Sequence, residues 1–229
     1  SIFEYCTVEY GSGIEVKTGN TFINQSTIRY NSGTGIKSTN GARHQISNNI
    51  ISNNITSGYG GTGGISISGS GVITGNTISG NVGHDGGGIS ASGSLIISGN
   101  TIENNKAGRY EDYDGRFRLD GDGGGIRSRS STLQILNNII KGNQAEKGGG
   151  IAGGGTITGN TIMGNYASSA GGGFSDSDRG SGTFTDNFVL NNSANSGGGI
   201  HLNEGGIDVV TGNIIAGNTS SNKGGAIYY

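Results

Sequence analysis

The sequence predicts an all-β fold, a solenoid of parallel strands, and three observations predict it. A short phrase, typified by TGNTISGN (74–81), recurs along the chain. A second phrase, two or three glycines followed by an apolar residue, keeps the same interval. Apolar and polar residues alternate after it, as in ISIS (65–68), and nothing has the 3.6-residue period of a helix. Short strands repeated at this interval can pair with their copies in the next repeat.

The first phrase sets the length of a rung, which is one turn of the solenoid. Successive copies are about 22 to 27 residues apart, except for one step of 38 residues between Ile102 and Ile140. Each unit has room for two or three strands of three to five residues, and the whole chain has room for about nine rungs. The central apolar residues of the copies are Ile28, Ile51, Ile78, Ile102, Ile140, Ile162, Val189 and Ile215.

The second phrase predicts a column of outward side chains. Its apolar residue, as in Ile126 or Ile151, is expected to point inward, so the next residue points outward by strand alternation. Several of these outward residues are small, which favours a shallow groove. In rung order the column reads Glu15, Lys37, Ser66, Ser90, Arg127, Ala152, Ser175, His201 and Tyr228.

Asparagine recurs at two corners of the predicted rung. We expect one ladder at Asn76, Asn100, Asn138, Asn160, Asn187 and Asn213, and another at Asn54, Asn81, Asn105, Asn143, Asn165, Asn192 and Asn218. Stacked amides can bond to one another along the rod. Asparagine also tolerates the left-handed backbone of a sharp corner, so we expect these same residues to adopt it.

The composition excludes several classes of protein. The 229 residues include 50 glycines and no proline, but frequent Ile and Val and a charged fraction of only 13% argue against disorder. A net charge of −2 gives no indication of nucleic-acid binding. No apolar run approaches 18 residues, so no membrane span is expected. Cys6 is the single cysteine, which rules out an internal disulfide.

The repeats resemble those of a known family. GGAI (224–227) and the spacing of Ile78 to Asn81 and Ile215 to Asn218 are similar to the GGA[ILV] and F-x-x-N repeats of chlamydial polymorphic membrane proteins, with Ile or Val in place of Phe. They also resemble right-handed parallel β-helix repeats of the pectate-lyase-like superfamily. The resemblance implies a right-handed parallel β-helix and an extracellular or cell-surface location. It does not choose among the lyases, hydrolases, tailspikes and adhesins of that superfamily.

The long step between rungs reflects an insertion at 107–122. It is rich in acids, arginines and aromatics, and loops that project from a solenoid commonly form its binding face. A polysaccharide or cell-surface glycan is the expected partner, with aromatic rings stacking on sugars and arginines facing carboxylates. The expected ligand-binding residues are Arg109, Tyr110, Tyr113, Arg116, Phe117, Arg118, Arg127 and Arg129.

Four acids of the insertion could bind calcium, the only cofactor the sequence suggests. Asp112-x-Asp114-Gly115 resembles the centre of an EF-hand loop, although Tyr110 replaces the first acid and no Glu closes the loop. The candidate ligands are Asp112, Asp114, Asp120 and Asp122.

Catalysis on an acidic polysaccharide, by a lyase or a related carbohydrate-active enzyme, is the main alternative to binding. A lyase needs a base and a cationic group, and a hydrolase needs two facing carboxylates. The candidates are Arg127, Arg129, Asp176, Asp178, His201 and Glu204. His44 and His84 are expected to lie in solvated turns.

The favoured interpretation is a single β-helix domain over 1–229 with a structural or adhesive function, in preference to an enzyme. Both ends of the chain fall inside the repeat, which is expected of a fragment of a longer protein. A second alternative is a subunit that stacks end to end into an extracellular fibre, because uncapped rungs present unpaired backbone groups.

Overall fold

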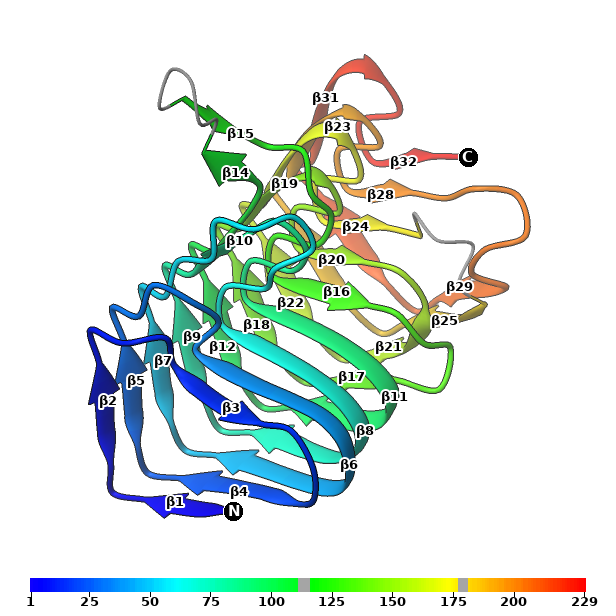
Figure 1. The fold of residues 1–229 in the computed structure, drawn as a ribbon. Helices are drawn as coiled ribbons and strands as arrows, with labels where there is room; N and C mark the ends of the chain where they lie inside the picture. Colours follow the sequence, from blue (N-terminus) through cyan, green and yellow to red (C-terminus); the bar gives the residue numbers. More distant parts are fainter. Residues whose placement is uncertain (111–115, 177–180) are drawn as a thin grey trace.

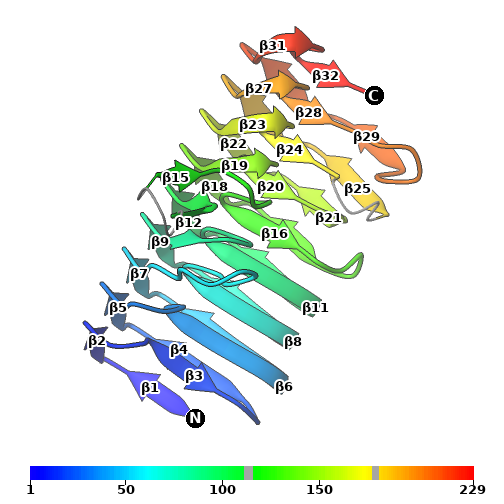
Figure 2. The same ribbon diagram turned by 45° about the horizontal axis from the view of Figure 1, so that its top comes forward.

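The structure, a computed structural model, describes residues 1–110, 116–176 and 181–229, without the side chains of 40–42 and 110. All regular elements in these ranges are β-strands, which confirms the all-β prediction. They wind into a rod whose two chain ends lie at opposite ends (Figure 1). Figure 2 shows the rungs stacked one above another along that rod. The same ranges hold no helix long and apolar enough to cross a membrane.

Three parallel sheets run along the rod in the described residues. The large sheet follows the glycine phrases and bends at a corner within β6, β8 and β11. Its strands are β1 (Ile2–Glu4), β3 (Ile14–Val16), β4 (Thr21–Asn24), β6 (Ile36–Ser47), β8 (Ile65–Thr74), β11 (Ile89–Ser98), β16 (Ile126–Ser128), β17 (Gln134–Leu136), β20 (Ile151–Ala152), β21 (Gly155–Thr158), β24 (Phe174–Ser175), β25 (Gly182–Thr185), β28 (Ile200–His201), β29 (Val209–Thr211) and β32 (Ile227–Tyr228).

The second sheet carries the first repeated phrase. Its strands are β2 (Thr7–Glu9), β5 (Thr27–Arg29), β7 (Ile50–Ser52), β9 (Thr77–Ser79), β12 (Thr101–Glu103), β18 (Ile139–Lys141), β22 (Thr161–Met163), β26 (Phe188–Leu190) and β30 (Ile214–Ala216). Counted over the described ranges, these nine strands are separated by eight intervals. The rod therefore makes about eight turns, close to the nine rungs expected from the sequence.

The third sheet precedes the glycine phrases and closes the rung. Its strands are β10 (Val82–Gly83), β13 (Lys106–Ala107), β19 (Gln144–Lys147), β23 (Tyr166–Ala170), β27 (Ser193–Ser196) and β31 (Thr219–Lys223). A separate antiparallel hairpin, β14 (Arg109–Tyr110) and β15 (Phe117–Arg118), leaves the rod after β13.

The core is a stack of branched apolar side chains. Ile78, Ile102 and Ile140 pair in register on successive rungs, and each is fully buried. The large sheet adds Ile126, Ile151 and its other first-position residues, so apolar side chains fill the rod from end to end. Burial of this apolar surface drives folding, and the repeat interval fixes the register.

The two asparagine ladders are confirmed, and each extends one rung further towards the N-terminus, to Asn49 and Asn31. The amide of Asn81 donates to Asn105 Oδ1 at 3.0 Å, and the backbone N–H of Asn81 donates to the same oxygen. The ladder asparagines from Asn31 to Asn192 are nearly fully buried, and Asn213 and Asn218 at the C-terminal end are half-buried. Their amides satisfy the backbone groups of each corner.

The expectation that the ladder asparagines are themselves left-handed is wrong. Positive φ occurs at the residue before each of them, as at Gly80 (63°), Asn104 (56°) and Asn137 (54°). The first residue of each corner pair therefore makes the turn, and the second carries the ladder.

The glycine triplets lie where neighbouring rungs approach closely. A Cβ atom on Gly150 would lie 2.5 Å from the carbonyl oxygen of Gly173 and 2.9 Å from Cγ2 of Ile162. Since a side chain would collide with the next rung, glycine is required here by space.

Candidate functional site

The predicted outward column lies in register along the large sheet. Arg127 pairs with Ser90 on one side and Ala152 on the other, and Ser175 pairs with Ala152 and His201. The whole series from Glu15 to Tyr228 follows in the expected order. The structure therefore brings Arg127, Ser175 and His201 onto one face of the rod.

The insertion forms the β14–β15 hairpin, which projects away from the rod beside β19 (Figure 1). Arg109 pairs with Arg118 across its two strands. The ammonium of Lys106 lies 5.6 Å from the centre of the Phe117 ring, a cation–π distance. Arg116 and Arg118 are exposed. Tyr113, Asp112 and Asp114 lie outside the described residues, as does the side chain of Tyr110.

Ion pairs fix the base of this hairpin against the large sheet. Arg109 Nε donates to Asp120 Oδ2 at 2.7 Å. Arg127 Nη1 lies 2.6 Å from Asp122 Oδ2 and 3.2 Å from Asp85 Oδ1. Asp85 also pairs with Arg129 Nη2 at 2.8 Å. We call Asp85, Asp122, Arg127 and Arg129 the arginine cluster.

The arginine cluster is more buried than expected. The side chain of Arg127 is only 11% exposed, while that of Arg129 is 41% exposed. Both guanidinium groups are paired with carboxylates of the chain itself. They position the hairpin, and their charges are largely balanced before any ligand arrives.

An aromatic group lies beside this cluster. The rings of Tyr59 and His84 are 4.3 Å apart, and the Arg109 guanidinium lies 4.4 Å from the Tyr59 ring. His84 is 8% exposed and His44 is 3% exposed, so the expectation that both are solvated is wrong. His84 is covered by Tyr59, and His44 Nε2 lies 3.0 Å from the Ser68 carbonyl oxygen.

Sequence reasoning missed Tyr59, His84 and Asp85. One signal was present: Asp85 and Asp122 each stand directly before a glycine triplet, in consecutive rungs. Equivalent positions in neighbouring rungs lie side by side. The carboxylates of Asp85 and Asp122 are therefore expected next to each other and close to the column that contains Arg127.

Two of the predicted calcium ligands, Asp120 and Asp122, each pair with an arginine. The described ranges contain no group of three or more His, Cys, Asp or Glu side chains suited to a metal ion. The other two candidate ligands, Asp112 and Asp114, lie outside those ranges.

A pocket of about 390 Å³ lies on the same face, towards the C-terminus from the arginine cluster. We call it the His201 pocket. Its walls include Lys147, Ser175, His201, Asn203 and Glu204. His201 packs against the Tyr228 ring at 5.2 Å. Two of the predicted residues, His201 and Glu204, therefore share one concave surface, whereas Asp178 lies outside the described residues.

Asp176 holds the loop at the edge of this pocket through hydrogen bonds. Its carboxylate is fully buried and accepts hydrogen bonds from the backbone N–H and side-chain amide of Asn203, at 2.8 and 2.7 Å. The N–H of Ile207 donates to its other oxygen at 3.3 Å. Asp176 therefore holds the loop that carries Glu204, and it is not exposed to a ligand.

Burial lowers the pKa of His201 below its ordinary value, and Lys147 lowers it further, while Asp176 partly opposes both effects. The imidazole is consequently neutral at neutral pH. One nitrogen of the neutral ring can donate a hydrogen bond while the other accepts one.

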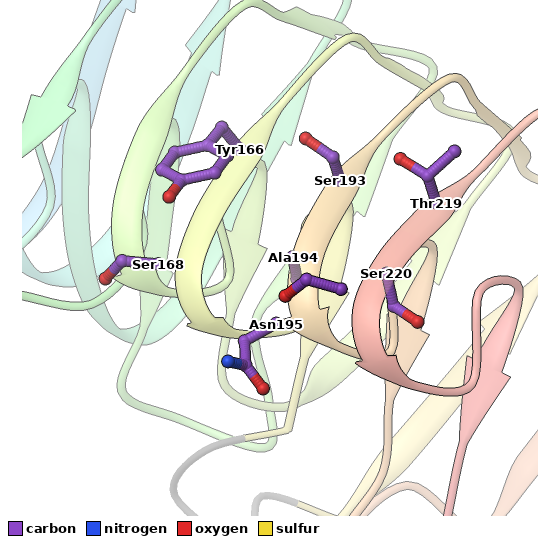
Figure 3. A pocket seen from close by; sticks show the side chains of 8 residues that line it. Tyr166, Ser168, Ser193, Ala194, Asn195, Thr219 and Ser220 are labelled. Atoms are coloured by element: carbon purple, nitrogen blue, oxygen red, sulfur yellow. The ribbon is translucent and has the colours of Figure 1, made fainter.

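A second hollow, of about 490 Å³, lies on the outer face of the third sheet (Figure 3). Tyr166, Ser193 and Thr219 pair in register across β23, β27 and β31. We call this the Tyr166 hollow. Figure 3 shows the hydroxyl groups of Ser168, Ser193 and Ser220 and the amide of Asn195 around it. Strand β23 contributes to both concavities, through Tyr166 here and Ala170 at the His201 pocket.

Comparison with known protein families covers most of the rod. A family model described as the right-handed β-helix region matches residues 1–168, more than two thirds of the chain. The chain belongs to the right-handed β-helix family. A model of the Chlamydia polymorphic membrane protein repeat matches residues 214–229 of this β-helix. No curated protein and no solved structure matches it.

The candidate catalytic residues of this β-helix are held in separate environments. Arg127 and Arg129 are ion-paired, Asp176 is buried and Glu204 is exposed. Ser175 Oγ and His201 Nδ1 have no hydrogen-bond partner among the described residues, so they are not joined as a nucleophile and base. The two concave surfaces present hydroxyl, amide and aromatic groups that can form hydrogen bonds and ring contacts.

Proposed function

We propose that this β-helix is a surface-associated structural or adhesive module that binds a glycan beside its hairpin. The surface association is supported by the C-terminal match to the repeat of a polymorphic membrane protein. The same location is what its resemblance to secreted β-helix proteins implies.

One observation carries the binding function: the arginine cluster and the Arg109–Asp120 pair anchor a projecting hairpin next to two concave surfaces. A site on a rigid scaffold loses less conformational entropy on binding. Arg116 and Arg118 are exposed on the hairpin, and the His201 pocket and Tyr166 hollow adjoin β23. A glycan chain could contact the hairpin and at least one hollow together.

The experiment is a binding measurement on immobilised neutral and acidic glycans with two variants. Deletion of 108–120 joins Ala107 to Gly121 and Asp122, which restores the spacing of Gly83, His84 and Asp85 in the preceding rung. The arginine cluster is retained. We expect loss of glycan binding with a nearly unchanged melting temperature. The control is Lys141→Ala on the second sheet, where Lys141 pairs with Glu103 and not with a residue of the hairpin.

Unfolding of the deletion variant would show that the hairpin is part of the core structure, and unchanged glycan binding would remove the hairpin from the site. The alternatives are tested with the same protein. Cleavage of acidic polysaccharides with calcium supplied would favour an enzyme, and rods that lengthen with concentration would favour end-to-end stacking.

A further inference from the structure

The His201 pocket contains polar groups that the chain leaves uncompensated. Ser175 is 1% exposed, and its hydroxyl has no hydrogen-bond partner within the described residues. The buried Nδ1 of His201 is in the same situation. The Lys147 side chain also lines the pocket, and the described part of the chain supplies no ion-pair partner for its ammonium group.

Unpaired polar groups in these positions lower the stability of the folded protein. A buried polar group without a partner destabilises a protein, because it has lost its hydrogen bonds to water and gained none in return. Ala152 occupies the position of Ser175 in the adjacent rung, with the same strand pairing, so the fold itself does not need a hydroxyl there. A hydroxyl that the fold does not use can bond to a group that enters the pocket, either a water molecule or a ligand.

The pocket is also preorganised. The buried Asp176 carboxylate holds Asn203 and Ile207 through three hydrogen bonds, and this fixes the loop that places Glu204 at the rim. Ser175 and His201 are held by strand pairing between β24 and β28. The backbone around the pocket is therefore fixed by the scaffold before a ligand binds.

The charges select one class of ligand. Lys147 offers one cation, His201 and Ser175 offer neutral hydrogen-bonding groups, and the exposed Glu204 carboxylate offers an acceptor. A multiply charged anion would be repelled by Glu204. A ligand with a single carboxylate and several hydroxyl groups can pair with Lys147 while its hydroxyls donate to Glu204.

We propose that the His201 pocket binds a carboxylate-bearing sugar unit, with its carboxylate at Lys147 and Ser175 and its hydroxyl groups at His201 and Glu204. The proposal rests on the proposed glycan-binding function and names the acidic sugar that one part of the surface takes.

The test is calorimetric titration with three acidic probes, each paired with a neutral counterpart. The probes are tetragalacturonate and tetraglucuronate, each against its methyl ester, and sialyllactose against lactose. We expect at least one acidic probe to bind about tenfold or more tightly than its counterpart, as a charge-assisted contact would provide. Lys147→Gln should abolish that difference, and Lys17→Gln, an exposed lysine in the first rung, should retain it.

Ser175→Ala provides a second variant that keeps the fold, because it copies Ala152 of the adjacent rung. We expect it to weaken binding of the acidic probe by about fivefold, the effect of one hydrogen bond. Its melting temperature should stay the same or rise, since a buried unpaired hydroxyl is removed.

Equal affinity for acidic and neutral probes would overturn the inference while leaving the glycan-binding function intact. Binding of neutral glycans alone would have the same meaning. Retention of the acidic preference in Lys147→Gln would place the carboxylate elsewhere. If no glycan of the immobilised panel binds, the proposed function and this inference fail together.

Discussion

The carboxylate of Asp85 lies 3.2 Å from the guanidinium of Arg127 in the following rung, and it bridges from there to Arg129. Two rungs are thereby joined by side chains in addition to backbone pairing. The bridge stands at the base of the hairpin, where the chain leaves its repeat and returns. The same ion pairs therefore both stabilise the stacking of these two rungs and hold the base of the hairpin in place.

Removing that carboxylate charge should loosen the hairpin base. In Asp85→Asn, Arg129 loses its carboxylate partner, whereas Arg127 keeps its ion pair with Asp122. Because these side chains are partly buried, we expect a loss of about 1 to 3 kcal/mol in the free energy of unfolding, measured by denaturant titration. Tryptic cleavage after Arg116 and Arg118 should accelerate. Glu103→Gln breaks a partly exposed pair with Lys141 and should cost less than about 1 kcal/mol. Equal effects of the two variants would refute a special role for Asp85.

At each asparagine corner, substitutions of the two adjacent residues should have very different effects on stability. Asn138 Oδ1 accepts from both N–H groups of Asn100, and its amide donates to Ile97 and Asn160. Asn138→Ala should therefore cost about 3 kcal/mol or more of unfolding free energy, since several buried bonds are lost. Asn137→Gly should change it by less than about 1 kcal/mol, because glycine accepts the same left-handed backbone. A larger loss at Asn137 than at Asn138 would reverse our assignment of their functions.

Two glycines distinguish close approach from backbone conformation. Gly150→Ala places a methyl group against Gly173 and Ile162 and should lower the melting temperature strongly. Gly164 has a φ of +61° and open space around its Cα, so Gly164→Ala should cost only about 1 to 2 kcal/mol. Gly164→Asn should be milder still, because Asn104 and Asn191 adopt that backbone at the equivalent corner. Thermal unfolding of the three variants provides the comparison, and a stable Gly150→Ala protein would contradict the packing argument.

His201 predicts the sign of a pH effect on stability. Its pKa is lowered in the folded state, so the unfolded chain binds the proton more readily, and stability falls as the pH falls below 6.5. The groups facing it are Lys147, Asp176, Glu204 and the Tyr228 ring. His201→Gln should flatten this part of the pH profile of unfolding free energy relative to the unaltered chain. A profile that is unchanged by the substitution would show that His201 does not titrate differently in the two states.

The repeat interval and the alternation after each glycine phrase were sufficient to predict the fold, the core isoleucines and the column through Arg127. Register in a solenoid follows from the repeat, so equivalent positions must stack. The partners of Arg127 were harder to predict because they depend on side-chain reach between rungs and on the path of the insertion. Burial of His84 depends on Tyr59, which arrives from a long connection outside the repeat.

The corner error has a simpler cause. Pairs such as Asn53-Asn54 do not reveal which residue turns and which forms the ladder. The glycines at Gly75, Gly80 and Gly99 were the available signal, because glycine substitutes where φ is positive and cannot supply a ladder amide. The pocket around His201 was only partly foreseen, since Lys147 and Ser175 come from different strands and no motif connects them.

Hydrogen–deuterium exchange with and without the tightest-binding glycan of the panel tests the central claim most directly. The claim is that glycan binding occurs beside the hairpin, on the part of the rod that carries β15, β24 and β28. We predict slower exchange in 116–122 and in 200–207, with no change in the first three rungs. Absence of any bound glycan, or protection confined to those first rungs, would contradict the account.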